Sequence, residues 1–390
     1  MSENKPIMNT LASESCPTVS VCMPHLNSRP FTEERIRTIL QQTLADWELI
    51  IVDSGSDDGS RELLEQCARR DPRVRLMDAP RDGIYPNLNR ALRLCRGKFV
   101  YVATSDDTMA TDCLEKMVAA LESNPNCGLC HCSLEIIDEN GHPVAPDDAW
   151  DNYAPQKYFG EWIQHPHIRR APHDGLLHLG FATVYTSLTQ LLVRRRVYED
   201  LGLFRTDCQS HADFEWGLRV SLIENVVHIP QKLATWRRHH RQATQPDQVM
   251  HARASGEFHR LAVMTLHSLH DRNPLLAVDL EQSTLLHFYL VDEFKARRIL
   301  AGSPGSRLAR TAQFAARHPR FFLHWIVNKV FRRQKITGDF GEAVKNEFQR
   351  LGLTNLLVRL DTVCSSPNRS ALPSMSGAMF QASCDSKPSS

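Results

Sequence analysis

The first hundred residues of this 390-residue chain alternate short apolar runs with segments of helical periodicity, which restricts the folds open to it. The apolar runs predict strands over residues 18–23, 47–52, 74–77 and 99–102. The intervening segments predict helices over 31–42, 61–70 and 87–95. Such alternation favours a parallel sheet covered by helices, with right-handed crossovers that bring the strand ends to one edge. We therefore predict an α/β fold with a central, mostly parallel, twisted sheet flanked by helices.

Polar residues follow three of these predicted strands. Asn27 follows the first strand, Asp53 opens a polar turn after the second, and Asp106 and Asp107 follow the fourth. Ligands of open α/β sheets bind just beyond the carboxyl ends of the strands. Two adjacent carboxylates there repel each other unless a cation lies beside them, and such hard oxygen ligands suit Mg²⁺ or Mn²⁺ on a diphosphate. The alternative is a solvent-exposed Asp-Asp turn without a ligand.

The middle of the chain continues the mixed pattern. Helices are predicted over 111–122 and 194–201 and from residue 211, and strands over 129–137, 189–193, 226–229 and 233–238. Residues 142–180 are predicted to be irregular despite their many histidines (His165, His167, His173 and His178). Because no histidine pair has i,i+4 spacing on a convincing helix, we interpret this region as a surface or acceptor-facing loop rather than a metal site.

Composition excludes several classes of protein. The net charge is +1, so no general electrostatic footprint for nucleic acid is present. No run of 18 apolar residues predicts a transmembrane helix, and the polar leader 1–17 does not resemble a secretory signal. The eleven cysteines form no disulfide framework, which favours a reducing, cytoplasmic location. Cys127, Cys130 and Cys132 resemble half of a zinc site or, alternatively, small thiols on a buried strand.

The C-terminal third has helical spacing without recognisable chemistry. We expect a helical extension over 246–364 and a disordered, Ser- and Pro-rich tail over 365–390. Residues 319–333 combine apolar residues with basic flanks. This segment is either a helix packed on the protein or a peripheral contact with an anionic membrane.

Four sequence motifs together resemble family 2 glycosyltransferases. They lie at Val19–Asn27, Glu48–Ser60, Asp82–Leu92 and Gly97–Asp107, in the order and spacing of that family, and Trp236–Thr244 resembles its closing strand and loop. The resemblance covers residues 18–245, which we identify as the catalytic domain. It implies a glycosyltransferase A fold, in which one nucleotide-binding α/β domain is joined to an acceptor-binding half.

The resemblance also assigns residues to the nucleotide-sugar donor. It implies that Asp53 accepts a hydrogen bond from the nucleotide base, with Pro24 and Asn27 beside the base and ribose. Asp82 and Asn89 belong to the motif that precedes the two aspartates and are assigned to the donor as well.

The remaining motifs supply the metal ligands and the base. Asp106 and Asp107 would hold Mg²⁺ or Mn²⁺, with His239 completing the shell and His240 as an adjacent rival. Asp213 matches the acid that removes the acceptor proton, and Glu215 is a spare carboxylate. A helix cap is the alternative role for Asp213, since it lies in the first turn of a predicted helix.

The chemistry implied is that of an inverting, metal-dependent glycosyltransferase. It would move a sugar from a nucleoside diphosphate to a glycan or lipid-linked acceptor in cell-surface polysaccharide biosynthesis, in the cytoplasm and with peripheral contact at the inner face of the membrane. The alternative is a catalytically degenerate protein that binds a glycan or nucleotide sugar on the same fold. Two departures motivate it, because Leu26 stands where many members carry an aromatic residue and Ala212 where many carry Glu.

Overall fold

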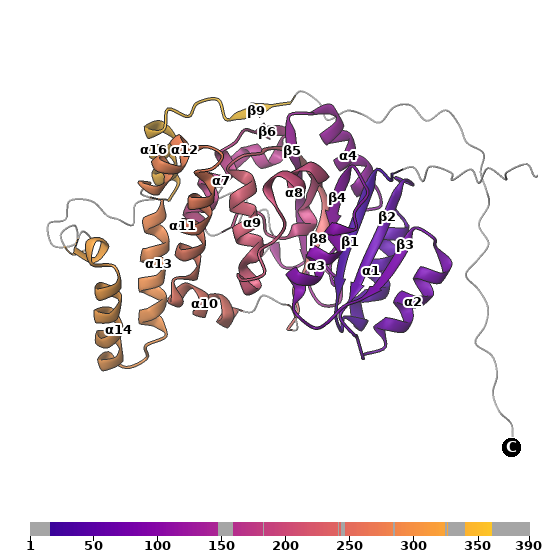
Figure 1. Cartoon of the computed structure of the whole chain (residues 1–390), viewed down its shortest axis with the longest axis horizontal. Coiled ribbons are helices and arrows are strands. Elements are labelled where there is room, and N and C mark those ends of the chain that lie inside the picture. The colour runs from indigo at the N-terminus through magenta and orange to yellow at the C-terminus, as the bar shows by residue number, and fades with distance from the viewer. Residues whose placement is uncertain are drawn as a thin grey trace, which may run out of the picture.

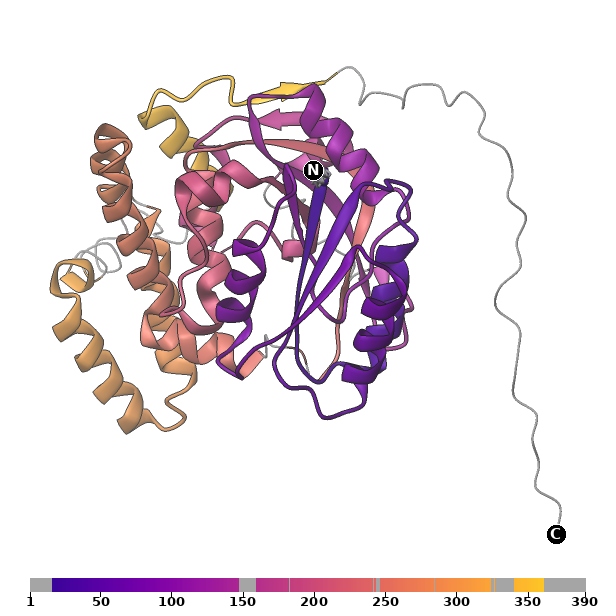
Figure 2. The same cartoon turned by 45° about the vertical axis from the view of Figure 1, so that its right-hand side comes forward.

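The computed structural model describes residues 16–146, 159–181, 183–240, 242, 246–283, 285–323, 326 and 340–360. The predicted tail 365–390 and most of the predicted leader lie outside these residues. Nine strands of the described chain form one sheet in the order β3-β2-β1-β4-β7-β5-β8-β6-β9. Figures 1 and 2 show the N-terminal strands at one end of the molecule and the C-terminal helices at the other.

The N-terminal half of the sheet is parallel, as the alternating pattern predicts. Its strands are β3 (Val74–Asp78), β2 (Trp47–Asp53), β1 (Val19–His25) and β4 (Phe99–Val102), connected through α1 (Arg29–Leu40), α2 (Ser60–Arg70) and α3 (Ile84–Arg93). Every residue of β1, β2 and β4 is buried, because helices cover both faces of such a sheet. Gly97 precedes β4 where a Cβ atom would lie 2.5 Å from the Ser20 backbone nitrogen, so only glycine fits this approach.

The second half of the sheet is mixed. β7 (Leu191–Arg194) lies antiparallel between β4 and β5 (Cys127–Ile137), and β5 pairs in parallel with β8 (Asn225–Arg237). β8 is one strand where the sequence predicted two, and its pairing with β5 shifts register near Cys132 and Ser133. The helix α4 (Cys113–Ser123) packs against β5. The three cysteines of β5 are buried in the sheet, as the strand interpretation predicted.

The prediction of an irregular surface or acceptor-facing loop over 142–180 was wrong for residues 160–180. This segment forms a 3-10 helix η2 (Gly160–Gln164), the strand β6 (His167–Arg169) and the helix α7 (His173–Phe181). His167 on β6 and His178 on α7 are 0% exposed, because they lie beside a buried ion pair between Arg169 and Asp174 at 2.9 Å. Polar composition misled the prediction, since histidines that bury in neutral form look like surface residues in a sequence.

The C-terminal part is mostly helical, as expected. Its helices are α10 (Pro246–Ser255), α11 (Glu257–Leu269), α12 (Pro274–Glu281), α13 (Leu286–Ile299), α14 (Pro304–Arg317) and α16 (Phe340–Arg350). It ends in a short strand, β9 (Leu357–Arg359), which pairs with β6 and which the sequence did not predict. None of the described helices has the length and apolar character needed to span a bilayer.

Candidate active site

A cavity of about 410 Å³ opens at the carboxyl ends of β1 and β4. Its wall also receives residues from α3, from the segment before β7, from the start of α9 (Ala212–Ser221) and from the end of β8. Five of the predicted site residues line it together: Pro24, Asp106, Asp107, Asp213 and His239. Segments more than one hundred residues apart therefore converge on one pocket that contains three of the predicted aspartates and His239, as the strand-end argument predicted for Asp106 and Asp107.

Asp106 and His239 form the centre of this pocket. The Asp106 Oδ2 atom lies 2.9 Å from His239 Nε2, with Asp106 half-buried and the His239 side chain 6% exposed. The Phe31 ring lies 4.7 Å from the His239 ring and helps to fix its orientation. The rival His240 turns outward, with a side chain 74% exposed and Nδ1 3.8 Å from Glu139. The structure thus brings His239, and not His240, to the aspartate.

Asp107 lies behind Asp106 and is only 1% exposed. Its carboxylate accepts hydrogen bonds from the Arg237 backbone N–H at 2.7 Å and from the Thr104 hydroxyl at 2.5 Å. Burial and the neighbouring Asp106 charge nevertheless raise the pKa of Asp107 to about 7. A cation bound here would therefore relieve the repulsion between the two carboxylates and favour their charged forms.

Arg237 fixes the loop that carries both aspartates. Its Nε donates to the Asp106 carbonyl at 2.7 Å, and its Nη2 donates to Glu34 of α1 at 2.6 Å. The guanidinium also lies over the Phe31 ring, 5.0 Å from its centre. Since Arg237 is 1% exposed, these contacts form in a low-dielectric interior and hold the end of β8 against the loop after β4.

Asp213 enters the cavity from the first turn of α9. Its carboxylate accepts a hydrogen bond from the Phe214 backbone N–H at 2.8 Å, but the N-cap of α9 is His211, so Asp213 is an anion of the first helical turn and the cap interpretation was wrong. The residue remains exposed to the cavity, yet the surrounding protein desolvates the carboxylate and raises its pKa. Hydrogen bonds from Phe214 and Tyr85 and the nearby His211 oppose this rise only in part. These hydrogen bonds and proton acceptance are compatible, because the two oxygens of a carboxylate offer about four lone-pair sites.

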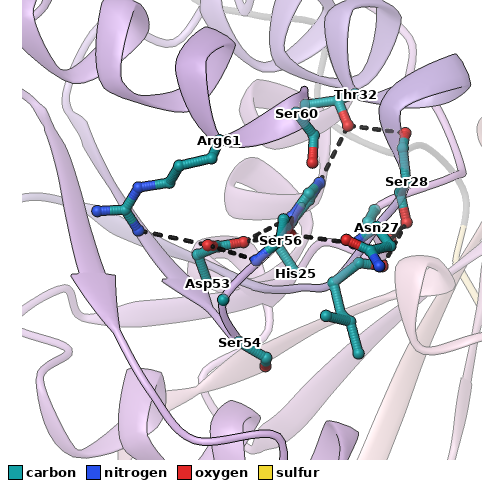
Figure 3. A network of polar contacts seen from close by, with 12 residues as sticks. His25, Asn27, Ser28, Thr32, Asp53, Ser54, Ser56, Ser60 and Arg61 are labelled. Atoms are coloured by element: carbon teal, nitrogen blue, oxygen red, sulfur yellow. Dashed lines mark hydrogen bonds and ion pairs between the residues drawn. The ribbon is translucent and has the colours of Figure 1, made fainter. Parts of the chain in front are cut away.

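Asp53 lies behind the wall of the cavity and is 0% exposed. Figure 3 shows its carboxylate between Arg61 and the pair His25 and Ser56. The Oδ1 atom is 3.0 Å from His25 Nδ1 and 2.6 Å from the Ser56 hydroxyl, and Oδ2 is 3.3 Å from Arg61. Burial alone would raise the pKa of Asp53, but the hydrogen bonds of His25 and Ser56 lower it well below its ordinary value. His25 and Ser54, its neighbours, line the cavity in its place.

Asn27 joins the two loops that follow β1 and β2. Its φ is +49°, a left-handed conformation that asparagine tolerates better than most residues. The side chain donates to Asp57 at 2.8 Å and accepts from the Asp57 backbone N–H at 2.9 Å. These contacts turn Asn27 towards the neighbouring loop, and it does not line the cavity.

Asp82 and Asn89 also lie away from the cavity wall. Asp82 forms an exposed ion pair with Arg90 at 2.6 Å. Asn89 is buried and makes hydrogen bonds with both backbone groups of Phe204, at 2.7 and 3.1 Å. These contacts hold α3 in place against neighbouring segments, and the assignment of both residues to the donor stays a prediction.

Several residues of the cavity wall received no role from the sequence, among them Arg81, Tyr85 and Ser187. Arg81 donates to the Gly55 carbonyl at 2.5 Å and to Asp57 at 2.8 Å, which places a guanidinium at the rim. Tyr85 reaches Asp213 from α3, and Ser187 reaches Asp107 at 3.4 Å. Arg81 directly precedes the motif Asp82–Leu92 and Tyr85 lies within it, so both were detectable by position, whereas nothing in the sequence near Ser187 indicated the site.

The residues present fit a divalent cation that is shared with a diphosphate. Among the described residues, no group of three or more His, Cys, Asp or Glu side chains is arranged to hold a metal. Asp106 and His239 nevertheless offer two ligand atoms beside a second carboxylate. Mg²⁺ in such sites typically takes one or two protein ligands and completes its shell with phosphate oxygens and water.

Comparison with known proteins agrees with this architecture. Residues 20–201 match the sequence model of the family described as Glycosyl transferase family 2. An uncharacterized protein of Mycobacterium tuberculosis, MT1568, is 26% identical over 243 residues, which span 61% of this chain and 72% of that protein. The TuaG protein of Bacillus subtilis, described as a possible teichuronic acid biosynthesis glycosyltransferase, is 31% identical over 129 residues. That alignment covers 33% of this chain and 51% of TuaG, so it spans about half of the relative.

A solved structure shares the fold. Residues 1–349 of S. aureus TarS, crystallised with UDP-GlcNAc, superpose with a TM-score of 0.54 and 16% sequence identity. The superposition covers 87% of this chain and 93% of TarS 1–349, and it therefore includes part of the C-terminal region as well as the sheet. The predicted glycosyltransferase A fold is confirmed.

Proposed function

Residues 20–201 belong to glycosyl transferase family 2, and from this premise we propose that the chain is an inverting glycosyltransferase that uses a nucleoside-diphosphate sugar. The observation that carries the proposal is the shared cavity, in which Asp106 and His239 lie in contact and Asp213 faces the same space. A paired anion and imidazole suit a metal-bound diphosphate, and a desolvated carboxylate suits a base.

In this proposal Asp213 accepts the proton of the acceptor hydroxyl. The oxygen attacks the anomeric carbon from the face opposite the leaving group, so the new C–O bond forms with inversion. The bond to the nucleoside diphosphate breaks, and its electron pair leaves with the phosphate. The raised pKa of Asp213 makes this carboxylate a stronger base than an aspartate with its ordinary pKa.

The donor diphosphate would lie beside Asp106 and His239, with Asp107 supporting the loop from below. A bound Mg²⁺ or Mn²⁺ would supply Lewis-acid stabilisation of the departing phosphate. Arg81 at the rim is a further candidate for contact with the donor, because its guanidinium lies on the cavity wall. The nucleotide base is assigned to the pocket of Pro24, His25 and Ser54, with Asp53 acting through His25.

The acceptor and the location are proposals of the same kind. We expect a glycan or lipid-linked acceptor, supported by the name of TuaG, which assigns that relative to teichuronic acid biosynthesis. A cytoplasmic enzyme with peripheral contact at the inner membrane face would meet such an acceptor. Of the predicted contact segment 319–333, residues 324–325 and 327–333 lie outside the described residues.

The decisive experiment measures release of nucleoside diphosphate from a panel of UDP- and GDP-sugars with Mn²⁺, with Mg²⁺ and with EDTA. We expect metal-dependent release that is lost in Asp106→Asn and in Asp213→Asn. Asp279→Asn, an exposed acid on α12, is the matched control and should behave like the wild type. Undiminished turnover in EDTA would refute the metal role. Donor binding in a thermal-shift assay without turnover, across a broad acceptor panel, would instead favour a degenerate binding protein.

A further inference from the structure

The carboxylate of Asp53, which the sequence assigned to the nucleotide base, is already saturated by the protein. Its Oδ1 atom lies 3.0 Å from His25 Nδ1 and 2.6 Å from the Ser56 hydroxyl. Its Oδ2 atom accepts from the Ser56 backbone N–H at 3.1 Å and from Arg61 at 3.3 Å. A carboxylate offers about four lone-pair sites, and Asp53 is 0% exposed. A base could therefore reach Asp53 only by displacing one of these partners.

His25 does not take over as an acceptor for the base. Its second ring nitrogen, Nε2, lies 3.0 Å from the Thr32 hydroxyl, and its side chain is 0% exposed. His25 thus contributes backbone rather than imidazole to the cavity wall. The His25 carbonyl accepts from the Ser54 backbone N–H at 2.9 Å, which fixes the next residue of the wall.

Ser54 points away from this network and lines the cavity. Figure 3 shows its side chain directed away from the Asp53 carboxylate, and the residue is only 5% exposed. Its hydroxyl oxygen accepts from the Asn87 amide Nδ2 atom at 2.6 Å. The orientation of that amide is fixed, because Nδ2 also donates to the Pro80 carbonyl at 3.1 Å and Oδ1 accepts from the Arg90 guanidinium. A carbonyl can only accept and a guanidinium can only donate, so the amide cannot be reversed.

Ser54 therefore presents a hydrogen-bond donor to the cavity. Its oxygen serves Asn87 as the acceptor, and none of the residues that the structure describes accepts its hydroxyl hydrogen. Arg81 lies on the same wall, and its guanidinium can only donate. A ligand at this end of the cavity must accordingly supply acceptor atoms.

We propose that Ser54 is a specificity-determining residue of the donor site, where it donates a hydrogen bond to a carbonyl oxygen of the nucleotide base. The inference rests on the proposed function, which places the base beside Ser54. Uracil and guanine carry such carbonyl oxygens, whereas adenine has an amino group where guanine has its carbonyl. An amino group opposite the donors of Ser54 and Arg81 would leave buried donors unpaired, which is unfavourable. The site thus favours uridine or guanosine diphosphates over adenosine diphosphate.

The test is isothermal titration of the full chain with UDP, GDP and ADP, each in the presence of Mn²⁺. The wild type should bind UDP or GDP more tightly than ADP. Ser54→Ala should weaken binding of the preferred nucleotide by roughly threefold to tenfold, the contribution of one neutral hydrogen bond, and leave ADP binding unchanged. Ser133→Ala is the matched control, because Ser133 on β5 is also 5% exposed but does not line the cavity.

Two further variants separate the direction of the hydrogen bond from the presence of the hydroxyl. Asn87→Asp replaces the amide donor by an acceptor, so the Ser54 hydroxyl should turn to the new carboxylate. The preference over ADP should then be lost although the hydroxyl remains. Asp53→Asn should lower the melting temperature, because it weakens the contacts with His25 and Arg61, and should leave the preference over ADP unchanged. Circular dichroism of each variant establishes that it folds.

The outcomes distinguish this inference from the proposed function. Unchanged nucleotide affinities in Ser54→Ala, with turnover of a nucleotide sugar by the wild type, would overturn the inference and leave the proposed function standing. Loss of the preference in Asp53→Asn but not in Ser54→Ala would assign recognition of the base to Asp53. A wild type that binds none of the nucleotides would remove both.

Discussion

Replacement of Arg237 by methionine tests whether the loop that carries Asp106 and Asp107 is held by tertiary contacts. Methionine keeps much of the apolar volume over Phe31 but removes the guanidinium. Two short side-chain hydrogen bonds are lost, to the Asp106 carbonyl at 2.7 Å and to Glu34 at 2.6 Å. Two longer ones to the carbonyls of Asp138 and Glu139, both at 3.3 Å, contribute less.

The size of the effect follows from these contacts. Hydrogen bonds that involve a charged group contribute about 1.5–3 kcal/mol each when buried, so the two short bonds together stabilise the fold by about 3 kcal/mol at the lower limit. Glu34 is 42% exposed at its side chain and can turn to water, which argues for that lower limit. For the catalytic domain predicted over residues 18–245, a loss of about 3 kcal/mol corresponds to a decrease in melting temperature of roughly 6–12 °C.

The assay is thermal unfolding followed by circular dichroism, together with nucleoside diphosphate release. Arg93→Met, an exposed arginine at the end of α3, removes the same charge without these bonds and should unfold like the wild type. We expect Arg237→Met to lose turnover even below its melting temperature, because Asp106 is no longer fixed beside His239. An Arg237→Met variant that melts with the Arg93→Met control and retains full turnover would refute this account of the site.

Three further outcomes are expected. Asp213→Asn should lower kcat about 100- to 10,000-fold and leave donor binding unchanged. Initial rates measure the first effect and thermal shift the second, and an equal loss of turnover and donor binding would argue against a role as base. Stability should fall with acid, because burial lowers the pKa of His178 to about 4 and of His167 to about 3, whereas the unfolded chain titrates near 6.5. The folded state then binds fewer protons than the unfolded chain, so this contribution to the free energy of unfolding is present above about pH 6.5 and is lost as the pH falls. At pH 5 each histidine lowers the free energy of unfolding by about 2 kcal/mol. Urea unfolding at about pH 6.5 and pH 5 measures the loss, and an unchanged midpoint would contradict burial of neutral histidines. Gly256→Ala should destabilise the helical region by about 1–3 kcal/mol, because the new Cβ would lie 2.4 Å from the Glu293 carboxylate and φ is +80°. Gly302→Ala is the control: its φ is +65° but no atom lies within 4 Å, so only the smaller strain of a left-handed alanine backbone is expected.

Local sequence patterns were sufficient to predict the N-terminal, parallel half of the sheet. β1, β2 and β4 are continuous apolar runs, and burial on both faces leaves little choice other than a parallel sheet. The position of Asp106 at a strand end followed from the same pattern. The spacing of the motifs also placed Asp213 in a helical first turn, where the structure has it.

Histidine burial could not be predicted from the same patterns. His167 and His178 looked like residues of an exposed loop, but the Arg169–Asp174 ion pair and the packing of α7 against α9 bury them. Whether an imidazole is buried depends on partners that approach from other elements, and a linear pattern contains no such information.

The sequence by itself determined which chemical groups this protein can bring to a strand edge, namely aspartates and a histidine. Only the tertiary structure decided how they are used. It turned His239 rather than His240 towards Asp106, and it placed Asp53 behind His25. The physical reason is that strand formation depends on neighbouring residues, whereas the direction and charge of a side chain depend on contacts made across distances of thirty to more than one hundred residues.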